Sequence, residues 1–278
     1  MRKTLTICLG VCLMVTVADA DPARVRLATT TSTDNSGLLA ELAPPFEKMF
    51  GVKLDVIAVG TGKALRLGEN GDVDVVLVHA KEAELKFIEE GYGVNRREVM
   101  HNDFVIIGPK SDPAGIRGMT DAAEALRKIV KTKSELLIQR SLGAQQVLFD
   151  LVAMGRVQLD WQHVVVHLDD KRREMLLAAS QKNAYVLVGR IPFLNGKIRN
   201  RDLVIMVQGD PRLRRPYLVV VANPRRQAPA LAAATRQLAA YLHKPETQAW
   251  IAEYGRGRLD SQPLFFPVKI PGKNGPGS

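Results

Sequence analysis

Residues 26–39, RLATTTSTDNSGLL, hold the densest group of hydrogen-bond donors in the chain. A short apolar strand ends here in a run of hydroxyl side chains, and a helix follows. The run consists of Thr29, Thr30, Thr31, Ser32 and Thr33. Because the first N–H groups of a helix lack internal partners and carry partial positive charge, hydroxyls at this place can form a cradle for an anion. A second interpretation is a capped helix after a strand, with Asn35 or Ser36 as the cap.

The N-terminus has the pattern of a secretory signal peptide. Residues 1–20 begin with Arg2 and Lys3, continue with an apolar run too short to span a membrane, and end in small residues, which predicts cleavage after Ala20. A lipoprotein signal is the weaker alternative, because Cys12 comes early in the apolar run. Both cysteines lie in this segment, so we expect a periplasmic protein without thiols or disulfides.

The chain is basic, with a formal net charge of +10 over 278 residues. Its basic pairs are spread without interleaved aromatic residues, and they are Arg96 and Arg97, Arg172 and Arg173, Arg214 and Arg215, and Arg225 and Arg226. These pairs either form an ordinary solvated surface or create a field that attracts anionic ligands. Nucleic acid is not an expected partner outside the cytoplasm. The length suits one or two globular domains.

The first hundred residues alternate between strand and helix patterns. Val25–Thr29 and Leu54–Val59 read as strands, and Leu38–Phe50 reads as a helix that its two prolines can interrupt. The second strand runs into Gly60–Lys63, which opens another short helix, so the arrangement of the first loop recurs. Val73–Val78 is continuously apolar, as expected of a parallel strand covered on both faces. The alternation predicts an α/β fold with a parallel sheet.

Motifs for catalysis, nucleotides or metals are weak. VGTGKA is only superficially a phosphate loop, because Ile57 occupies the position of its first glycine and Ala64 that of its Ser or Thr. His163 and His167 flank three valines in a strand-like run and do not have metal-ligand spacing. The chain therefore offers donors without a base that could activate a nucleophile.

Neutral donors suit a permanently charged tetrahedral anion. Such a ligand accepts up to about a dozen hydrogen bonds and must be satisfied when it is desolvated. Lys63, Arg140 and Arg190 follow predicted strands, and ligands bind at strand ends in open α/β sheets. The sequence therefore predicts an oxyanion-type ligand.

Five segments carry a resemblance to a known family. In order they read TTTSTDNSGLL, VIAVGTGKAL, GENGDVDVVLVHA, GYGVNRREVMHNDFVIIGP and QPLFFP. They resemble the tungstate-binding periplasmic proteins of ABC transporters, the TupA type, over residues 25–130 and more loosely over 201–268. The resemblance implies a type II periplasmic binding protein fold with two α/β lobes. Two crossing strands would join the lobes, near Phe104–Ile107 and Leu218–Ala222.

The resemblance also implies a domain plan and partners. After the leader at 1–20, lobe 1 takes residues 21–103, lobe 2 takes 104–218, and a return segment of lobe 1 takes 219–268. The last segment, 269–278, is rich in glycine and proline and is predicted to be disordered. The implied ligand is a tungstate or molybdate oxyanion, without any cofactor, metal or chemistry. The implied partner is a membrane permease, and the implied state is a monomer.

In such proteins the first lobe grips the oxyanion with a hydroxyl loop and a GTG loop, and the second lobe adds two arginine-containing segments. The corresponding residues here are Thr30, Thr31, Ser32, Thr61, Gly62, Arg140 and Arg190. The second lobe departs from the family, because its segments read QRSLGAQQ and VGRIPF, and the charged LDDKRREML replaces a glycine-rich stretch. Each lost hydrogen bond to a charged ligand costs about 1.5–3 kcal/mol. Ser141, Gln145 or Gln146 are candidates for replacing the lost donors.

Two other functions stay open from the sequence. The altered second lobe is compatible with another small anion, such as a carboxylate or phosphonate, or with a sensor that presents its surface to a membrane protein. A secreted hydrolase that uses the hydroxyl loop is the third hypothesis, and the missing base argues against it.

Overall fold

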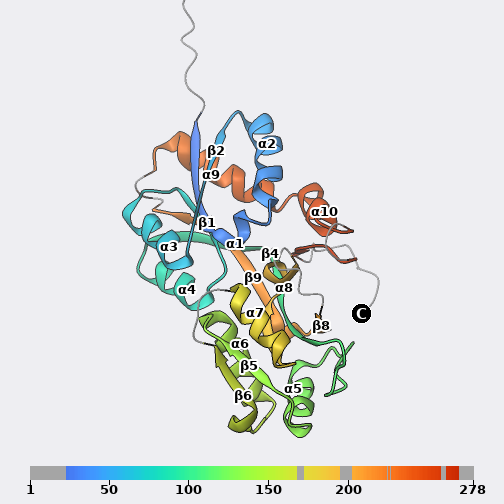
Figure 1. Ribbon diagram of the computed structural model, residues 1–278. Helices are drawn as coiled ribbons and strands as arrows, with labels where there is room; N and C mark the ends of the chain where they lie inside the picture. The colour runs from blue at the N-terminus through green and yellow to red at the C-terminus, as the bar shows by residue number, and fades with distance from the viewer. Residues whose placement is uncertain are drawn as a thin grey trace, which may run out of the picture.

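The computed structural model describes residues 23–167, 172–194, 202–223, 225, 227–257 and 261–268. Figure 1 shows two α/β lobes, one above the other, with the long strand β4 running between them. The predicted signal peptide, 1–20, and the predicted disordered tail, 269–278, lie outside the described residues. Within the described part of the chain, no helix has both the length and the apolar character needed to cross a membrane.

Lobe 1 is built on a mixed sheet with the strand order β2-β1-β3-β9-β4, and β10 pairs with β4. Its strands are β1 (Arg24–Thr30), β2 (Lys53–Val59), β3 (Val75–Val78), β4 (Gly93–Pro109), β9 (Arg214–Ala222) and β10 (Phe266–Pro267). β1 is parallel to β2 and β3, as the alternation predicts, and β9 is antiparallel to both of its neighbours. A late segment of the chain therefore lies in the middle of the first sheet.

Helices cover both faces of this sheet (Figure 1). They are α1 (Thr31–Asp34), α2 (Leu38–Phe50), α3 (Thr61–Asn70), α4 (Lys81–Glu89), α9 (Pro229–Leu242) and α10 (Pro245–Glu253). On one face, Phe46 of α2 packs on Tyr241 of α9, with ring centroids 5.5 Å apart. On the other face, Phe87 of α4 closes a smaller cluster with α3 and β9. α2 runs through its two prolines without interruption.

Lobe 2 has the strand order β4-β7-β5-β6, with β8 also paired to β4. Its other strands are β5 (Leu136–Gln139), β6 (Val164–His167), β7 (Tyr185–Gly189) and β8 (Leu203–Val207). Its helices are α5 (Ala122–Lys131), α6 (Leu142–Met154), α7 (Arg172–Gln181) and α8 (Arg190–Leu194), with 3₁₀ turns η1 (Trp161–His163) and η2 (Pro211–Leu213). Two apolar clusters, one on each side of the sheet, form its core.

The strand β4 changes sheets in mid-course. Asp103 is opposite Arg214 of β9 in the lobe 1 sheet, whereas Phe104 is opposite Gly189 of β7 in the lobe 2 sheet. The chain returns from lobe 2 to lobe 1 in the link between the end of β8 and the start of β9. Leu218–Ala222, where the resemblance implied the second crossing, instead pairs with β3 and β4 inside lobe 1. An apolar run has the same pattern in either sheet, and only its pairing partners decide where it lies.

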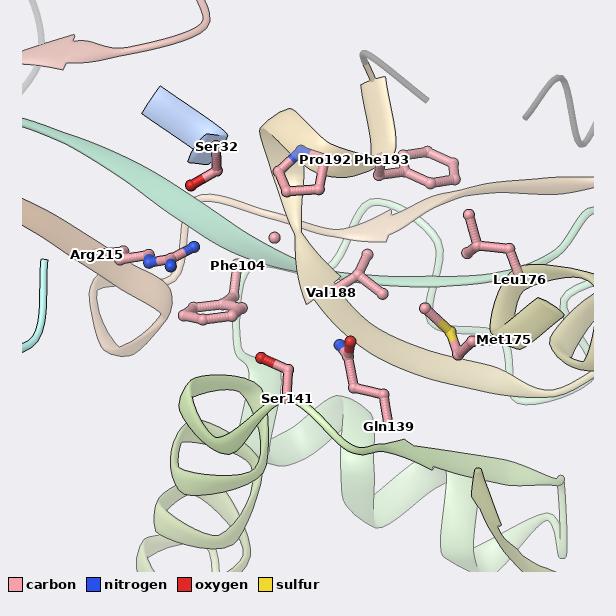
Figure 2. Close-up of a pocket in the computed structure, with 11 residues that line it drawn as sticks. Ser32, Phe104, Gln139, Ser141, Met175, Leu176, Val188, Pro192, Phe193 and Arg215 are labelled. Carbon is pink, nitrogen blue, oxygen red and sulfur yellow. The ribbon is translucent and has the colours of Figure 1, made fainter. Parts of the chain in front are cut away.

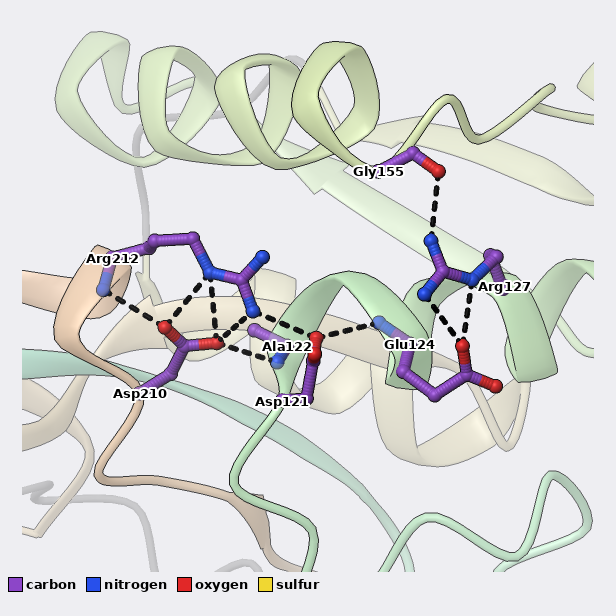
Figure 3. A network of polar contacts seen from close by, with 7 residues as sticks. All are labelled: Asp121, Ala122, Glu124, Arg127, Gly155, Asp210 and Arg212. Carbon is purple, nitrogen blue, oxygen red and sulfur yellow. Dashed lines mark hydrogen bonds and ion pairs between the residues drawn. The ribbon is translucent and has the colours of Figure 1, made fainter.

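A buried carboxylate holds this return in place (Figure 3). Asp210, only 1% exposed, accepts the Ala122 N–H at 2.7 Å and four hydrogen bonds from three nitrogens of Arg212. Arg212 also reaches Asp121, whose side chain caps α5. Burial by itself raises the pKa of Asp210, but the hydrogen bonds from Arg212 and Ala122 hold it below its usual value. Asp210 thus ties the link before β9 to the start of α5.

Candidate functional site

The hydroxyl loop joins β1 to α1. Thr30 is the N-cap of α1, and its Oγ1 accepts the Thr33 N–H at 3.3 Å. The same oxygen lies 3.0 Å from Ser32 Oγ and 2.7 Å from Thr33 Oγ1. Thr30 and Thr33 are buried, while Ser32 is partly exposed. Ser32 therefore carries the outward end of this hydroxyl cluster. Ser36, one of the two predicted caps, accepts the Leu38 N–H at the start of α2 instead.

A pocket of about 100 Å³ lies where the two lobes meet. Its polar wall consists of Ser32, Arg215 at the start of β9, and Gln139, Ser141 and Gly189 of lobe 2. Figure 2 shows Ser32 and Arg215 on one side of Phe104 and Ser141 and Gln139 on the other. Side chains from both lobes thus surround one small space.

Arg215 brings the positive charge to this wall. Its Nε lies 3.0 Å from His79 Nδ1 and its Nη2 lies 3.0 Å from His79 Nε2. Its guanidinium carbon also sits 5.2 Å from the centroid of the Phe104 ring. Burial, and next the charge of Arg215, lowers the pKa of His79 to about 3. The imidazole is therefore neutral, and the positive charge of the pair belongs to the arginine.

The hydroxyl and GTG loops differ in their relation to the pocket. Ser32 lies on its wall and Thr30 lies directly behind Ser32. Thr31 is exposed at the start of α1. Thr61 and Gly62 form the first turn of α3, where Thr61 is partly buried and Gly62 is exposed, and neither belongs to the pocket lining. Of these five residues, only Ser32 lines the pocket, and Thr30 supports it from behind.

Neither predicted arginine of lobe 2 lies on the pocket wall. Arg140 is exposed after β5. Arg190, the first residue of α8, is 1% exposed, and its Nη1 donates to the Pro263 carbonyl at 2.6 Å. Its guanidinium carbon lies 5.8 Å from the centroid of the Phe266 ring. Arg190 therefore joins lobe 2 to the return segment of lobe 1.

The candidate replacement donors also differ in position. Ser141 lies on the pocket wall, but Gln145 donates to the Gln139 carbonyl at 2.8 Å and Gln146 donates to Asp150 at the surface. The charged stretch that replaces the glycine-rich segment begins outside the described residues. Its later part supplies an apolar wall through Met175 and Leu176.

Sequence reasoning missed Arg215. The only signal is its membership of a basic pair at the start of the last long apolar strand, and the sequence allows such a pair to be either solvated surface or part of a field that attracts anions. The pairing of β9 with β4 brings Arg214 and Arg215 next to Asp103 and Asn102, where β4 passes from one lobe to the other, and this pairing is not visible in the sequence. The described residues contain no group of three or more His, Cys, Asp or Glu side chains placed to hold a metal ion.

The neutral state of His79 has a consequence for acid stability. The unfolded imidazole binds a proton near pH 6.5 and the folded one only near 3, so the unfolded state binds more protons between these values. His79 therefore has no destabilising effect above pH 6.5, but it lowers the free energy of unfolding as the pH falls from 6.5 toward 3. The loss is at most about 1.4 kcal/mol per pH unit. Urea unfolding of wild type and His79→Gln at pH 7, 6, 5 and 4 measures it. Equal pH slopes for the two proteins would contradict the assignment, because the carboxylates titrate in both.

Comparison with known proteins identifies the class. The PBP superfamily domain matches residues 17–153. The structure resembles the tungstate-binding protein TupA from Desulfovibrio alaskensis, with a TM-score of 0.77 and 35% identity over 89% of this chain and 100% of that one. It also resembles the tungstate ABC transporter structure from Geobacter sulfurreducens, with a TM-score of 0.69 and 42% identity over 83% and 98% of the two chains. The molecule is a type II periplasmic binding protein.

The family follows from sequence. The chain is 34% identical to the tungstate-binding protein TupA of Peptoclostridium acidaminophilum over 244 residues, covering 87% of this chain and 84% of that one. The chain belongs to the TupA family of periplasmic binding proteins of ABC transporters. This is a family of solute-binding proteins and not of enzymes, which removes the hydrolase hypothesis.

Proposed function

We propose that this protein holds one tetrahedral oxyanion, tungstate or molybdate, in the pocket between its lobes and delivers it to the membrane permease of an ABC transporter. One observation carries the proposal: the pocket takes Ser32 and Arg215 from the lobe 1 side and Ser141 and Gly189 from lobe 2. A ligand there contacts both lobes, and only such a ligand favours the closed arrangement over an open one. The relatives named as tungstate-binding proteins support this choice of ion.

The size of the pocket favours a small inorganic ion. Pockets for drug-sized ligands measure roughly 300–1,000 Å³. A space of about 100 Å³ therefore holds a group the size of one oxyanion rather than a larger metabolite.

The chemistry of the wall agrees with an anion. Two serine hydroxyls and one guanidinium are donors, the Gln139 amide already donates one N–H to the Leu187 carbonyl, and none of the described residues on the wall is a carboxylate. A fully deprotonated oxyanion needs only donors, and charge-assisted hydrogen bonds are the strongest that a protein offers. The wall thus suits a dianion without an O–H group.

The remaining ligand residues belong to the same proposal. Thr31, Thr61 and Gly62 in lobe 1 and Arg140 in lobe 2 are proposed from the family resemblance alone, because they do not line this pocket. Export by a signal peptide at 1–20 and delivery as a monomer complete the proposal. The first lobe limit, at 103, is part of it as well, whereas the predicted limit at 218 moves forward to the link between β8 and β9, because Arg214–Ala222 pairs within the lobe 1 sheet.

Thermal unfolding with equal concentrations of tungstate, molybdate, sulfate and phosphate tests the function. A ligand at 100 times its dissociation constant adds about 2.7 kcal/mol of stability, so tungstate or molybdate should raise the unfolding temperature markedly. Ser32→Ala should weaken the binding by about 1.5–3 kcal/mol, and Ser134→Ala, on the far side of lobe 2, should leave it unchanged. No shift with any of the four ions would overturn the proposal.

A small organic anion is the second candidate. Met175, Leu176, Val188 and Phe193 make the side of the pocket away from Arg215 apolar (Figure 2). A carboxylate or phosphonate with a short apolar group could place its charge at Arg215 and its carbon atoms against this wall. Stabilisation by such anions, with none by the inorganic ions, would favour this candidate.

A further inference from the structure

We propose that Arg215, held in place by His79, is the charge-selecting residue of the pocket, so that the protein distinguishes dianions from monoanions at the start of β9. The inference rests on the proposed function and deepens it. It assigns the positive charge of the site to β9 and not to the two arginines that the family resemblance indicates.

Two contacts from different elements fix the Arg215 guanidinium. His79, just after β3, approaches its Nε and Nη2 at 3.0 Å each, and the Phe104 ring of β4 lies against its plane at 5.2 Å. The guanidinium is held along its edge by His79 and lies over the ring of Phe104, so it has little freedom to rotate. The charge is therefore placed before the ligand arrives, which lowers the entropy cost of binding.

His79 is itself held rigidly. The next residue, Ala80, donates its N–H to Glu84 Oε1 at 2.6 Å, and Glu84 is fully buried and paired with Arg96 at 3.2 Å. On its other side the imidazole packs on the buried ring of Tyr217, with centroids 4.8 Å apart. The position of the imidazole is thus set by α4, β4 and β9 together.

The contact between His79 and Arg215 requires a neutral imidazole. A neutral ring has one acceptor nitrogen, which can take a guanidinium N–H, whereas an imidazolium has only donors and would repel the arginine. Arg215 contacts this ring directly, and the Glu84–Arg96 pair is connected to it through the Ala80 N–H. Neutral His79 therefore acts as a hydrogen-bond acceptor that aims the charge of Arg215.

The same imidazole connects the charge to the hydroxyl loop. His79 Nε2 lies 3.3 Å from Thr30 Oγ1, which in turn lies 3.0 Å from Ser32 Oγ. Ser32 and Arg215, which both line the pocket, are therefore connected through two side chains, Thr30 and His79. Loss of His79 should disturb both donors at once.

The first experiment compares ions of equal shape and different charge. Isothermal titration of the ligand-free protein with tungstate, a dianion, and perrhenate, a tetrahedral monoanion, gives the charge preference of the site. Arg215→Gln should weaken tungstate about 10- to 100-fold and perrhenate by a smaller factor, because the charge-assisted bond is stronger for a dianion. Arg215→Lys should keep the preference for tungstate. Arg214→Gln, which removes an exposed charge from the same strand, should change both affinities less than twofold.

The second experiment tests His79 as a positioning residue. His79→Ala should weaken tungstate about 10-fold, and His79→Gln, which keeps an acceptor, should restore most of the affinity. Unfolding of each ligand-free variant shows that it is folded.

Several results would overturn the inference. They are equal effects of Arg215→Gln and Arg214→Gln, equal loss for both ions, or equal loss in the two His79 variants. If the wild-type protein bound neither ion, the proposed function would fail, and this inference with it. Tungstate binding by wild type together with unaffected binding in the variants would reject the inference alone.

Discussion

Asp210→Ala is expected to lower the free energy of unfolding by about 2–3 kcal/mol, because it removes the acceptor of a buried N–H and a charge-assisted hydrogen bond from Arg212, which keeps its contact with Asp121. The substitution leaves the Ala122 N–H without its acceptor and takes from Arg212 the carboxylate that it contacts at 2.7 Å. It also releases the link before β9 from the start of α5. Urea unfolding followed by tryptophan fluorescence measures the loss.

Glu124→Ala is the matched control for this prediction. Glu124 also pairs with an arginine, Arg127, but the pair is exposed and lies within one helix (Figure 3). Its removal should cost less than about 1 kcal/mol. If Asp210→Ala cost no more than Glu124→Ala, the buried network would not hold the link.

Arg190→Ala should destabilise the ligand-free protein by about 3–5 kcal/mol. The change empties the volume of a large side chain that is 1% exposed, and it leaves the Pro263 carbonyl without the Arg190 donor at 2.6 Å. A residue that served only as a contact to the ion would not change the stability of the empty protein. The prediction therefore separates a structural role of Arg190 from the ligand role that the family resemblance indicates.

Arg140→Ala provides the comparison. Arg140 occupies the other family arginine position but is exposed, so its replacement should change the stability of the ligand-free protein by less than about 0.5 kcal/mol. Unfolding both variants without ligand and titrating them with tungstate yields stability and affinity separately. Equal stability of the two variants would contradict the role that we assign to Arg190.

The fold could be predicted well from local patterns. The alternation of strands and helices indicated a parallel α/β sheet, and the segments that resemble TupA indicated the type II fold. Both predictions are confirmed. These features are local or family-wide, because apolar periodicity and turn chemistry do not depend on distant contacts.

The helix α2 continues through two prolines that the sequence suggests could interrupt it. Pro44 and Pro45 are exposed, so the carbonyls that they leave without donors face water, while Leu42 and Phe46 of the same helix are buried in the core. The Leu42 carbonyl also accepts the Tyr241 hydroxyl at 3.2 Å. Tertiary packing thus maintains a helix that local propensity would interrupt.

The charged residues of the pocket could not be predicted in the same way. Arg214 and Arg215 are adjacent on a strand, so their side chains point to opposite faces, but only the pairing of β9 decides which face meets the pocket. The burial of Arg190 likewise depends on Pro263, a residue 73 positions later. Contacts between residues far apart in the sequence decide both the face on which Arg215 lies and the burial of Arg190, and a local sequence pattern carries no information about such contacts.

The central place of β9 in the first sheet has a consequence for the order of folding. Val76 and Leu77 of β3 pair with Val220 and Val219, so neither β3 nor the first half of β4 gains its β9 neighbour until the chain is available as far as residue 222. The second sheet, by contrast, draws only on residues 104–207. During synthesis and export, the first sheet therefore presents two unpaired apolar edges while the second can already form, and such edges bind other strands. The newly exported chain is thus most prone to aggregate just before its last long strand arrives.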